Sequence, residues 1–214
     1  MNTEIANEIL KNKTIVVIRD VWGDELKKLL NALCQGGVTC AEIAFGVKTD
    51  EQTGEQIAEA VKLFGDKMII GAGTVITESR LETAVKAGAR FCVAPDTDKD
   101  IISSAKKRGV LFIAGAFTPS EIKRAWVSGA DMVKIFPASA LGAAYVSAVF
   151  APLGSLLPLI VFGGVTSDNA HEFFKAGAKG LGVGSELVRK DLIKAGRYDE
   201  ITKITKTFFQ KING

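Results

Sequence analysis

The stretch VSGADMVKIFP (127–137) contains the structural unit that recurs along this 214-residue chain. In it, the end of an amphipathic segment is followed by a glycine, a short turn and a run of apolar residues. Glycine is favoured just beyond the end of a helix because it tolerates a positive φ angle. The segments KAGARFCVAP (86–95) and KAGAKGLGVGS (175–185) have the same design. The pattern predicts helices that each return the chain to the start of a buried strand.

Eight apolar runs fit this unit and are expected to be strands. They are TIVVIR (14–19), TCAEIAF (39–45), KMIIGAG (67–73), RFCVAP (90–95), VLFIAG (110–115), DMVKIFP (131–137), LIVFGG (159–164) and GLGVGS (180–185). Amphipathic patterns predict helices at 23–35, 50–64, 77–87, 98–108, 118–128, 142–151, 167–176, 185–195 and 198–211, and an N-terminal helix within 1–13. Apolar strands separated by helices indicate a parallel sheet covered on both faces.

Eight such units in roughly 200 residues fit a small (β/α)8 TIM barrel. We therefore expect a single barrel domain over residues 1–214, with extra helices at both ends. A doubly wound open sheet is the alternative. Against it, the first strand–helix junction has no glycine-rich dinucleotide loop, because TIVVIRD is followed by VWGDE.

Composition excludes several classes of function. The net charge is +3 and no basic cluster is interleaved with aromatic residues, which argues against a nucleic-acid partner. No apolar run approaches the ~20 residues that span a bilayer. Cys34, Cys40 and Cys92 lack metal-binding spacing, and their odd number without a secretory signal predicts reduced thiols in the cytoplasm. The one histidine, His171, is expected to be exposed in the helix at 167–176, so no metal site is predicted.

Lys134 is the unexpected residue, because it lies among Met132, Val133, Ile135 and Phe136. An ammonium buried without a partner usually gives up its proton. Alternate side chains of a barrel strand face the interior. If Val133 and Ile135 pack against helices, Met132, Lys134 and Phe136 point inward.

The same alternation in the second strand turns Glu42 inward with Cys40 and Ala44, while Ile43 and Phe45 pack outward. A lysine and a glutamate then enter one cavity. A neutral amine in a dry cavity can form a Schiff base with a ketone, and a nearby carboxylate can move protons. A buried ion pair, or a lysine that reaches solvent, is the structural alternative.

Other candidates lie where strands end. FGGVTSDN and GVGSEL follow the seventh and eighth strands, after which barrels commonly hold a phosphate with backbone N–H groups. Gly163, Gly164, Gly184 and Ser185 would form that cradle. Thr74, in GAGTV (71–75), would sit at the mouth, although a plain helix-entry turn is equally consistent. Arg19 ends the first strand and could bind a carboxylate or phosphate, or form a salt bridge at the rim.

The motifs EIAF, GAGTV, KIFPAS, FGGV and GVGSEL, in this order, resemble the family of 2-keto-3-deoxy-6-phosphogluconate (KDPG) and 4-hydroxy-2-oxoglutarate (KHG) aldolases. The likeness covers about residues 15–200. It implies a class I lyase on a (β/α)8 barrel, without metal or other cofactor and typically a homotrimer. Such an enzyme splits a phosphorylated 2-keto-3-deoxy sugar acid into pyruvate and glyceraldehyde 3-phosphate.

The resemblance also implies roles for individual residues. Lys134 matches the Schiff-base lysine and Glu42 the acid–base glutamate, while Thr74 and Phe136 match residues of the pyruvate pocket. Residues matching the phosphate-side loops are Gly163, Gly164 and Ser185.

Two positions depart from the family pattern. Gly46 stands where members often have an arginine, and Phe162 where many have a threonine. Lys48 or Arg19 would have to replace that arginine. The departures leave open whether the substrate is KDPG, its galactonate-derived stereoisomer (KDPGal), or 4-hydroxy-2-oxoglutarate.

Two rival functions remain. One is a barrel epimerase or isomerase that acts on sugar phosphates without an imine. The other is a non-catalytic sugar-phosphate-binding barrel, which would give no reason for Lys134 and Glu42 to share a cavity.

Overall fold

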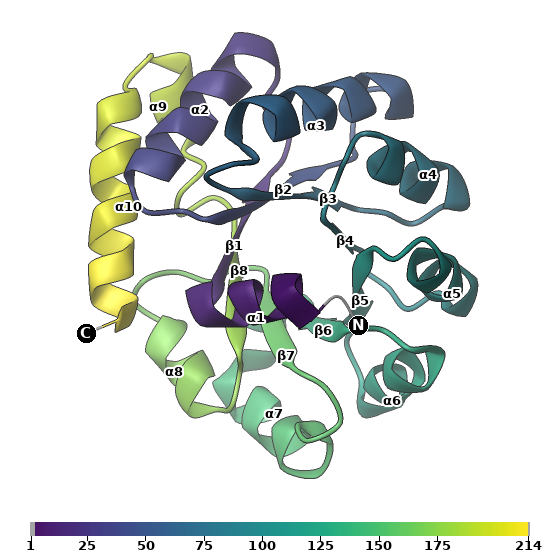
Figure 1. Ribbon diagram of the computed structural model, residues 1–214. Coiled ribbons are helices and arrows are strands. Elements are labelled where there is room, and N and C mark those ends of the chain that lie inside the picture. Colours follow the sequence, from purple (N-terminus) through teal and green to yellow (C-terminus); the bar gives the residue numbers. More distant parts are fainter. Residues whose placement is uncertain (1–2, 214) are drawn as a thin grey trace.

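The computed structural model describes residues 3–213, so the part of the predicted N-terminal helix at residues 1–2 lies outside it. Eight parallel strands close into one barrel in the order β1 to β8 (Figure 1). The strands are β1 (Thr14–Ile18), β2 (Cys40–Ala44), β3 (Ile69–Gly73), β4 (Phe91–Val93), β5 (Leu111–Ala116), β6 (Met132–Ile135), β7 (Leu159–Phe162) and β8 (Gly180–Val183). The predicted (β/α)8 barrel is therefore confirmed.

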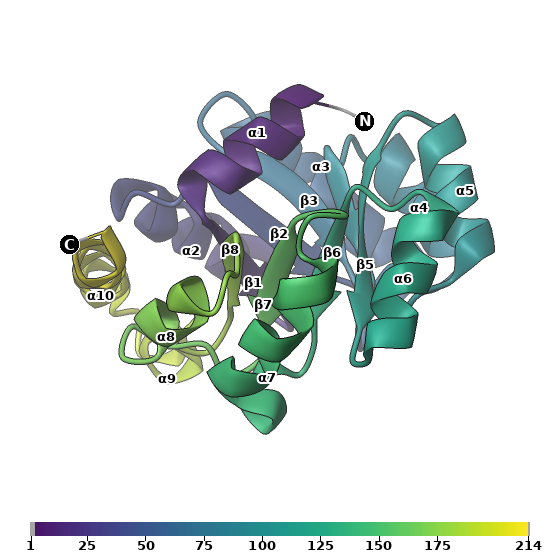
Figure 2. The same ribbon diagram turned by 90° about the horizontal axis from the view of Figure 1, so that it is seen from below.

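Within residues 3–213, ten helices accompany the strands. They are α1 (Thr3–Asn12), α2 (Gly23–Gln35), α3 (Asp50–Phe64), α4 (Glu78–Lys86), α5 (Lys99–Lys107), α6 (Pro119–Ser128), α7 (Ala138–Leu153), α8 (Ala170–Lys175), α9 (Lys190–Lys194) and α10 (Tyr198–Asn213). Helices α2 to α8 and α10 surround the barrel, and α1 lies across the end at which the strands begin (Figures 1 and 2). No helix within residues 3–213 is long and apolar enough to cross a membrane.

The expected glycine turns are present. Gly88, Gly129 and Gly177 follow helices α4, α6 and α8 with φ angles of 85°, 89° and 104°. Side chains with a Cβ are strained at such angles. Each glycine thus allows the chain to turn from a helix into the next strand, as the repeated motif predicts.

Three helix boundaries differ from prediction. Helix α7 begins at Ala138 and is kinked at Gly142, whose φ of 72° and ψ of 169° are not helical. Helix α8 is shorter than 167–176, because Asn169 holds the preceding loop: its Oδ1 accepts from the Thr166 N–H at 2.9 Å and its Nδ2 donates to the Gly164 carbonyl at 2.9 Å. After β8 a turn closes first, with the Val188 N–H on the Gly184 carbonyl, so α9 starts only at Lys190.

Side chains separate into two apolar clusters. The outer cluster packs strand against helix and includes Ile43, Val133 and Ile135. The inner cluster fills the barrel and includes Cys40, Met132, Phe162 and, from α1, Ile5 and Ile9. The alternation predicted for strands β2 and β6 is therefore confirmed, and α1 closes the barrel end opposite the strand C-termini.

Candidate active site

Lys134 and Glu42 lie on strands β6 and β2, on opposite sides of the eight-stranded barrel. Both side chains are buried, with 8% of Lys134 and 1% of Glu42 exposed. No ion pair joins them within residues 3–213, and the Glu42 Oε2 accepts no hydrogen bond from the described protein. The carboxylate therefore keeps lone pairs free for a proton donor at a buried position.

The surroundings perturb both pKa values. Burial raises the pKa of the Glu42 carboxyl above its ordinary range, against the opposing charges of Lys134 and Arg19. Burial also lowers the pKa of the Lys134 ammonium below its ordinary value of 10.5, an effect opposed by the charge of Glu42 and reinforced by Arg19. A lowered lysine pKa increases the fraction of neutral, nucleophilic amine at neutral pH.

Two aromatic rings face the Lys134 nitrogen. The ring centroids of Phe136 and Phe162 lie 4.8 and 4.6 Å from its Nζ. Phe162 fits because β8 carries Gly182 beside it; a Cβ there would lie 1.9 Å from the ring. The rings stabilise a cation at Nζ by cation–π attraction, whether ammonium or iminium.

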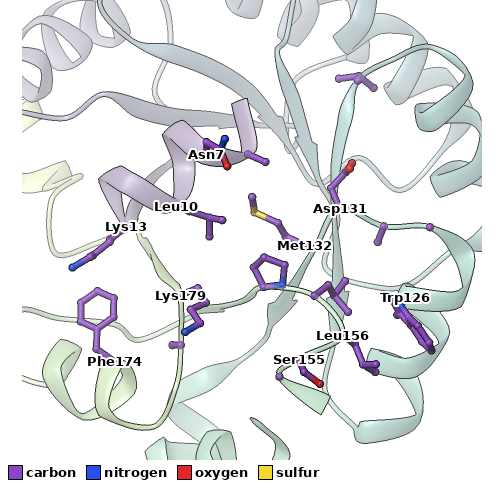
Figure 3. A pocket seen from close by; sticks show the side chains of 18 of the residues that line it. Asn7, Leu10, Lys13, Trp126, Asp131, Met132, Ser155, Leu156, Phe174 and Lys179 are labelled. Carbon is purple, nitrogen blue, oxygen red and sulfur yellow. The ribbon is translucent and has the colours of Figure 1, made fainter. Parts of the chain in front are cut away.

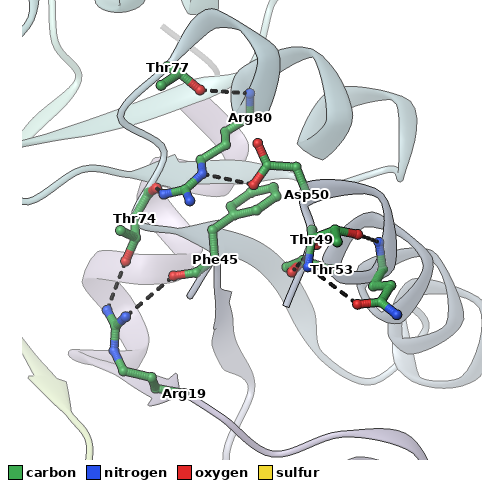
Figure 4. Close-up of polar contacts among 9 residues, drawn as sticks. Arg19, Phe45, Thr49, Asp50, Thr53, Thr74, Thr77 and Arg80 are labelled. Atoms are coloured by element: carbon green, nitrogen blue, oxygen red, sulfur yellow. Dashed lines mark hydrogen bonds and ion pairs between the residues drawn. The ribbon is translucent and has the colours of Figure 1, made fainter. Parts of the chain in front are cut away.

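Arg19 reaches from the end of β1 to Thr74 after β3 (Figure 4). Its Nη2 donates to the Thr74 Oγ1 at 2.8 Å, and its Nη1 donates to the Phe45 carbonyl at 3.3 Å. The side chain of Arg19 thus lies beside Gly46, where an added Cβ would be 3.8 Å from Nη1. Arg19, directly after β1, therefore supplies a guanidinium at the mouth of the barrel, next to Gly46.

Arg80 is a residue that the sequence analysis missed. Its Nη1 donates to the Thr74 carbonyl at 3.2 Å, its Nε donates to Asp50 Oδ1 at 3.0 Å, and its guanidinium lies over the Phe45 ring (Figure 4). Thr74 has a φ of 60°, a conformation that costs a non-glycine residue about 1–3 kcal/mol. Arg19 on its hydroxyl and Arg80 on its carbonyl hold Thr74 in this conformation.

Gly73 allows Glu42 to occupy its position. A Cβ on Gly73 would lie 2.6 Å from the Glu42 Oε1, which is closer than side chains approach each other. The glycine in GAGTV therefore makes room for the carboxylate.

The predicted phosphate-side loops are adjacent, because β7 and β8 pair with Phe162 opposite Gly182. Gly163 and Gly164 have φ angles of 91° and 71°, and the two loops are joined by Ser167, whose Oγ donates to Glu186 Oε1 at 3.1 Å. Within residues 3–213, the N–H groups of Gly164 and Ser185 donate to no protein acceptor. These N–H groups are therefore free to bind an anion.

His171 lies outside this site. It is exposed in α8, and its Nε2 shares a hydrogen bond with the Lys211 carbonyl at 2.6 Å. Within residues 3–213 no three His, Cys, Asp or Glu side chains are placed to hold a metal ion. The three cysteines are free, with Cys40 and Cys92 buried.

The barrel thus holds a desolvated lysine and a buried carboxylate in its interior and a guanidinium at its mouth. Comparison with known proteins identifies the family. The family model described as KDPG and KHG aldolase matches residues 5–204. The chain belongs to this aldolase family and is a carbon–carbon lyase.

Two curated relatives illustrate the similarity. The 2-dehydro-3-deoxy-6-phosphogalactonate aldolase of Escherichia coli (strain K12) is 33% identical over 82% of this chain and 84% of its own length. The 2-dehydro-3-deoxy-phosphogluconate aldolase of Treponema pallidum (strain Nichols) is 30% identical over 85% of each chain.

A solved structure is also similar to this chain. It is KDPG aldolase from Legionella pneumophila, with pyruvate captured at low pH as a covalent carbinolamine intermediate. It has a TM-score of 0.85 and 25% identity, and the match covers 95% of this chain and 97% of that one.

Proposed function

We propose that the protein is a class I aldolase that forms a Schiff base at Lys134 and cleaves a 2-keto-3-deoxy-6-phospho sugar acid, such as KDPG, to pyruvate and glyceraldehyde 3-phosphate. The observation that carries this proposal is the lysine buried opposite a buried glutamate in one barrel. The covalent pyruvate adduct captured in the Legionella relative supports it.

In this mechanism the neutral Lys134 amine attacks the C2 ketone of the substrate, and loss of water gives the iminium. The C4 hydroxyl then loses its proton to Glu42, directly or through water, and the C3–C4 bond breaks. The electron pair of that bond flows into the iminium and forms an enamine. Protonation of the enamine at C3 and hydrolysis release pyruvate and the free lysine. The raised pKa of the Glu42 carboxyl makes it a stronger base than an exposed glutamate, which suits a group that both takes and returns a proton.

Arg19 and Thr74 are the proposed ligands of the substrate carboxylate. Their mutual hydrogen bond places a guanidinium and a hydroxyl together at the mouth. Arginine matches a carboxylate well because its planar N–H groups can donate in pairs. Phe136 would form the apolar wall of the pyruvate pocket, beside the Lys134 nitrogen.

Gly163, Gly164, Gly184 and Ser185 are the proposed phosphate cradle. The free N–H groups of Gly164 and Ser185 support this assignment. The substrate would thus extend from Arg19, across Lys134, to the loops after β7 and β8.

The galactonate-derived stereoisomer KDPGal is the second candidate substrate. The E. coli and Rhizobium meliloti relatives, 33% and 31% identical, are named for aldolases of this compound. A homotrimer, which the resemblance implies, and a cytoplasmic location, which the three free cysteines support, belong to the same proposal.

A coupled assay of pyruvate release tests the function. Purified enzyme is given KDPG, KDPGal and 4-hydroxy-2-oxoglutarate, and the non-phosphorylated forms of the first two. We expect one phosphorylated acid to have the highest kcat/KM. Its non-phosphorylated form should differ mainly by a higher KM. If none of these acids releases pyruvate, the proposal is contradicted.

A further inference from the structure

A groove of about 1330 Å³ lies at the end of the barrel opposite the proposed active site. Its lining includes residues that immediately precede or begin strands, among them Lys13, Met132 and Lys179, and the α1 residues Asn7 and Leu10. We call it the basal groove. Small-molecule sites commonly have volumes of roughly 300–1,000 Å³, so the basal groove is large enough for a metabolite.

The basal groove has two chemically different sides. Figure 3 shows Lys13, Phe174 and Lys179 along one side and Trp126 with Leu156 along the other, while Leu10 and Met132 lie between them. Trp126 is 44% exposed, an unusual exposure for so large an apolar side chain. The arrangement offers charge at one side and apolar surface at the other.

The lining is positively charged. The lining holds three lysines, Lys13, Lys106 and Lys179, and one carboxylate, Asp131, so its formal charge is +2 with His171 counted as neutral. Asp131 is already engaged, because its Oδ2 accepts from the Phe112 N–H at 2.9 Å. None of the three lysines forms an ion pair within residues 3–213.

Helix ends reduce this positive potential in part. Helices α1, α5, α6, α7 and α8 end at this face, and the carbonyl groups at their C-termini carry partial negative charge. An anion would therefore bind beside the full charges of the lysine ammonium groups and not beside the helix ends. Among the described residues, the Lys13 Nζ lies 5.7 Å from the centroid of the Phe174 ring, and the Lys179 Nζ lies 5.3 Å from that of the Phe150 ring.

We propose that the basal groove binds an organic anion with one acidic group and an apolar, preferably aromatic, body. The acidic group would lie between Lys13 and Lys179, and the body would extend over Leu10 and Met132 toward Trp126. This site is separate from the proposed aldolase chemistry, although Met132 lies only two residues before Lys134 on β6.

The test uses two probes that differ in charge. Anilinonaphthalene sulfonate is anionic and aromatic, and N-phenylnaphthylamine is its uncharged counterpart; both fluoresce more strongly in apolar sites. Their affinities are measured for the full-length wild type, Lys13→Glu, Lys179→Glu and Lys179→Met. Lys28→Glu is the matched control, because Lys28 is exposed on α2 and does not line the groove.

We expect saturable binding of the anionic probe to the wild type. Each charge reversal in the groove should weaken it about ten- to hundredfold, which is the value of a lost charge-assisted contact. Lys179→Met keeps the apolar part of the side chain. It should weaken binding of the anionic probe and leave the affinity for the uncharged probe unchanged. Lys28→Glu should change neither, and all variants should still be trapped at Lys134 with pyruvate and borohydride.

Three results would overturn the proposal. Equal affinity of the wild type and the groove variants for the anionic probe would show that the lysines bind no anion. Displacement of the probe by saturating pyruvate would place it in the aldolase site. A change in oligomer mass on charge reversal, measured by sedimentation, would make this face a contact between copies of the chain.

Discussion

Replacing Gly73 by alanine should displace the Glu42 carboxylate while leaving the fold intact. The new Cβ would lie 2.6 Å from the Glu42 Oε1 and 2.9 Å from its Cδ. Ordinary contact begins at 3.4 Å, so the oxygen must retreat by about 0.8 Å, the difference between 3.4 and 2.6 Å. The atom that must move is the end of a flexible side chain. We therefore expect the free energy of unfolding to fall by about 1 kcal/mol, which is at the low end for overpacking.

The effect on catalysis should be far larger than the effect on stability. A misplacement of about 1 Å can cost roughly 10²-fold in rate. We therefore expect kcat for pyruvate release to fall about 10²-fold, while the Tm falls by only about 2–4 °C. Imine formation at Lys134, measured by borohydride trapping with pyruvate, should continue, because the lysine itself does not move.

Gly180→Ala is the matched control. It places the same methyl group on a barrel strand, where the nearest atoms would be 3.4 Å away and the φ angle is not positive. Turnover and Tm of this control should stay near wild type. Wild-type turnover in Gly73→Ala, with the carboxylate forced to move, would refute the argument that the position of Glu42 sets the rate of cleavage.

The other predictions concern the lysine, the glutamate, pH and metal. Lys134→Arg should abolish pyruvate release, because a guanidinium stays protonated and cannot form an imine; activity near wild type would exclude covalent catalysis there. Glu42→Gln should slow release about 10²–10⁴-fold while trapping survives, and an equal loss of both would give Glu42 a role in imine formation instead. The rate of trapping should rise with pH and level off below pH 10.5, because burial lowers the pKa of Lys134. Glu42→Gln should shift the midpoint of this pH profile to still lower pH, because it removes the negative charge that raises the pKa of Lys134. An unshifted midpoint would show that the two groups are not coupled. EDTA should leave pyruvate release unchanged, and activity that is lost on chelation and restored by a divalent ion would contradict the metal-free mechanism.

The fold was predictable because the sequence repeats one local motif, in which a helix is followed by a glycine, a turn and an apolar strand. Glycines that follow helices precede apolar runs, and the period of two within a run puts Lys134 on the same side of its strand as Met132, and Glu42 on the same side as Cys40, inside the barrel. Both signals are local, so neither depends on long-range packing. Helix boundaries at α7, α8 and α9 were less accurate, because loop contacts such as those of Asn169 decide where those helices begin.

The support of Thr74 was not predictable from the sequence. Arg80 and Asp50 meet across 30 residues of sequence, and Arg19 and Thr74 across 55. Nothing in the residue spacing marks these pairs, because they depend on which loops become neighbours when the barrel closes. The sequence left open whether Lys48 or Arg19 takes the place of the arginine expected at Gly46. Arg19 is favoured, because its side chain lies next to Gly46.

Borohydride trapping with pyruvate, followed by peptide mass mapping, tests the central claim most directly. The account predicts one reduced pyruvate adduct per chain, located on the peptide that contains Lys134, with the other lysines unmodified. It also predicts that the adduct is absent without borohydride and in Lys134→Arg. No adduct under saturating pyruvate, or an adduct on a different lysine, would contradict the account.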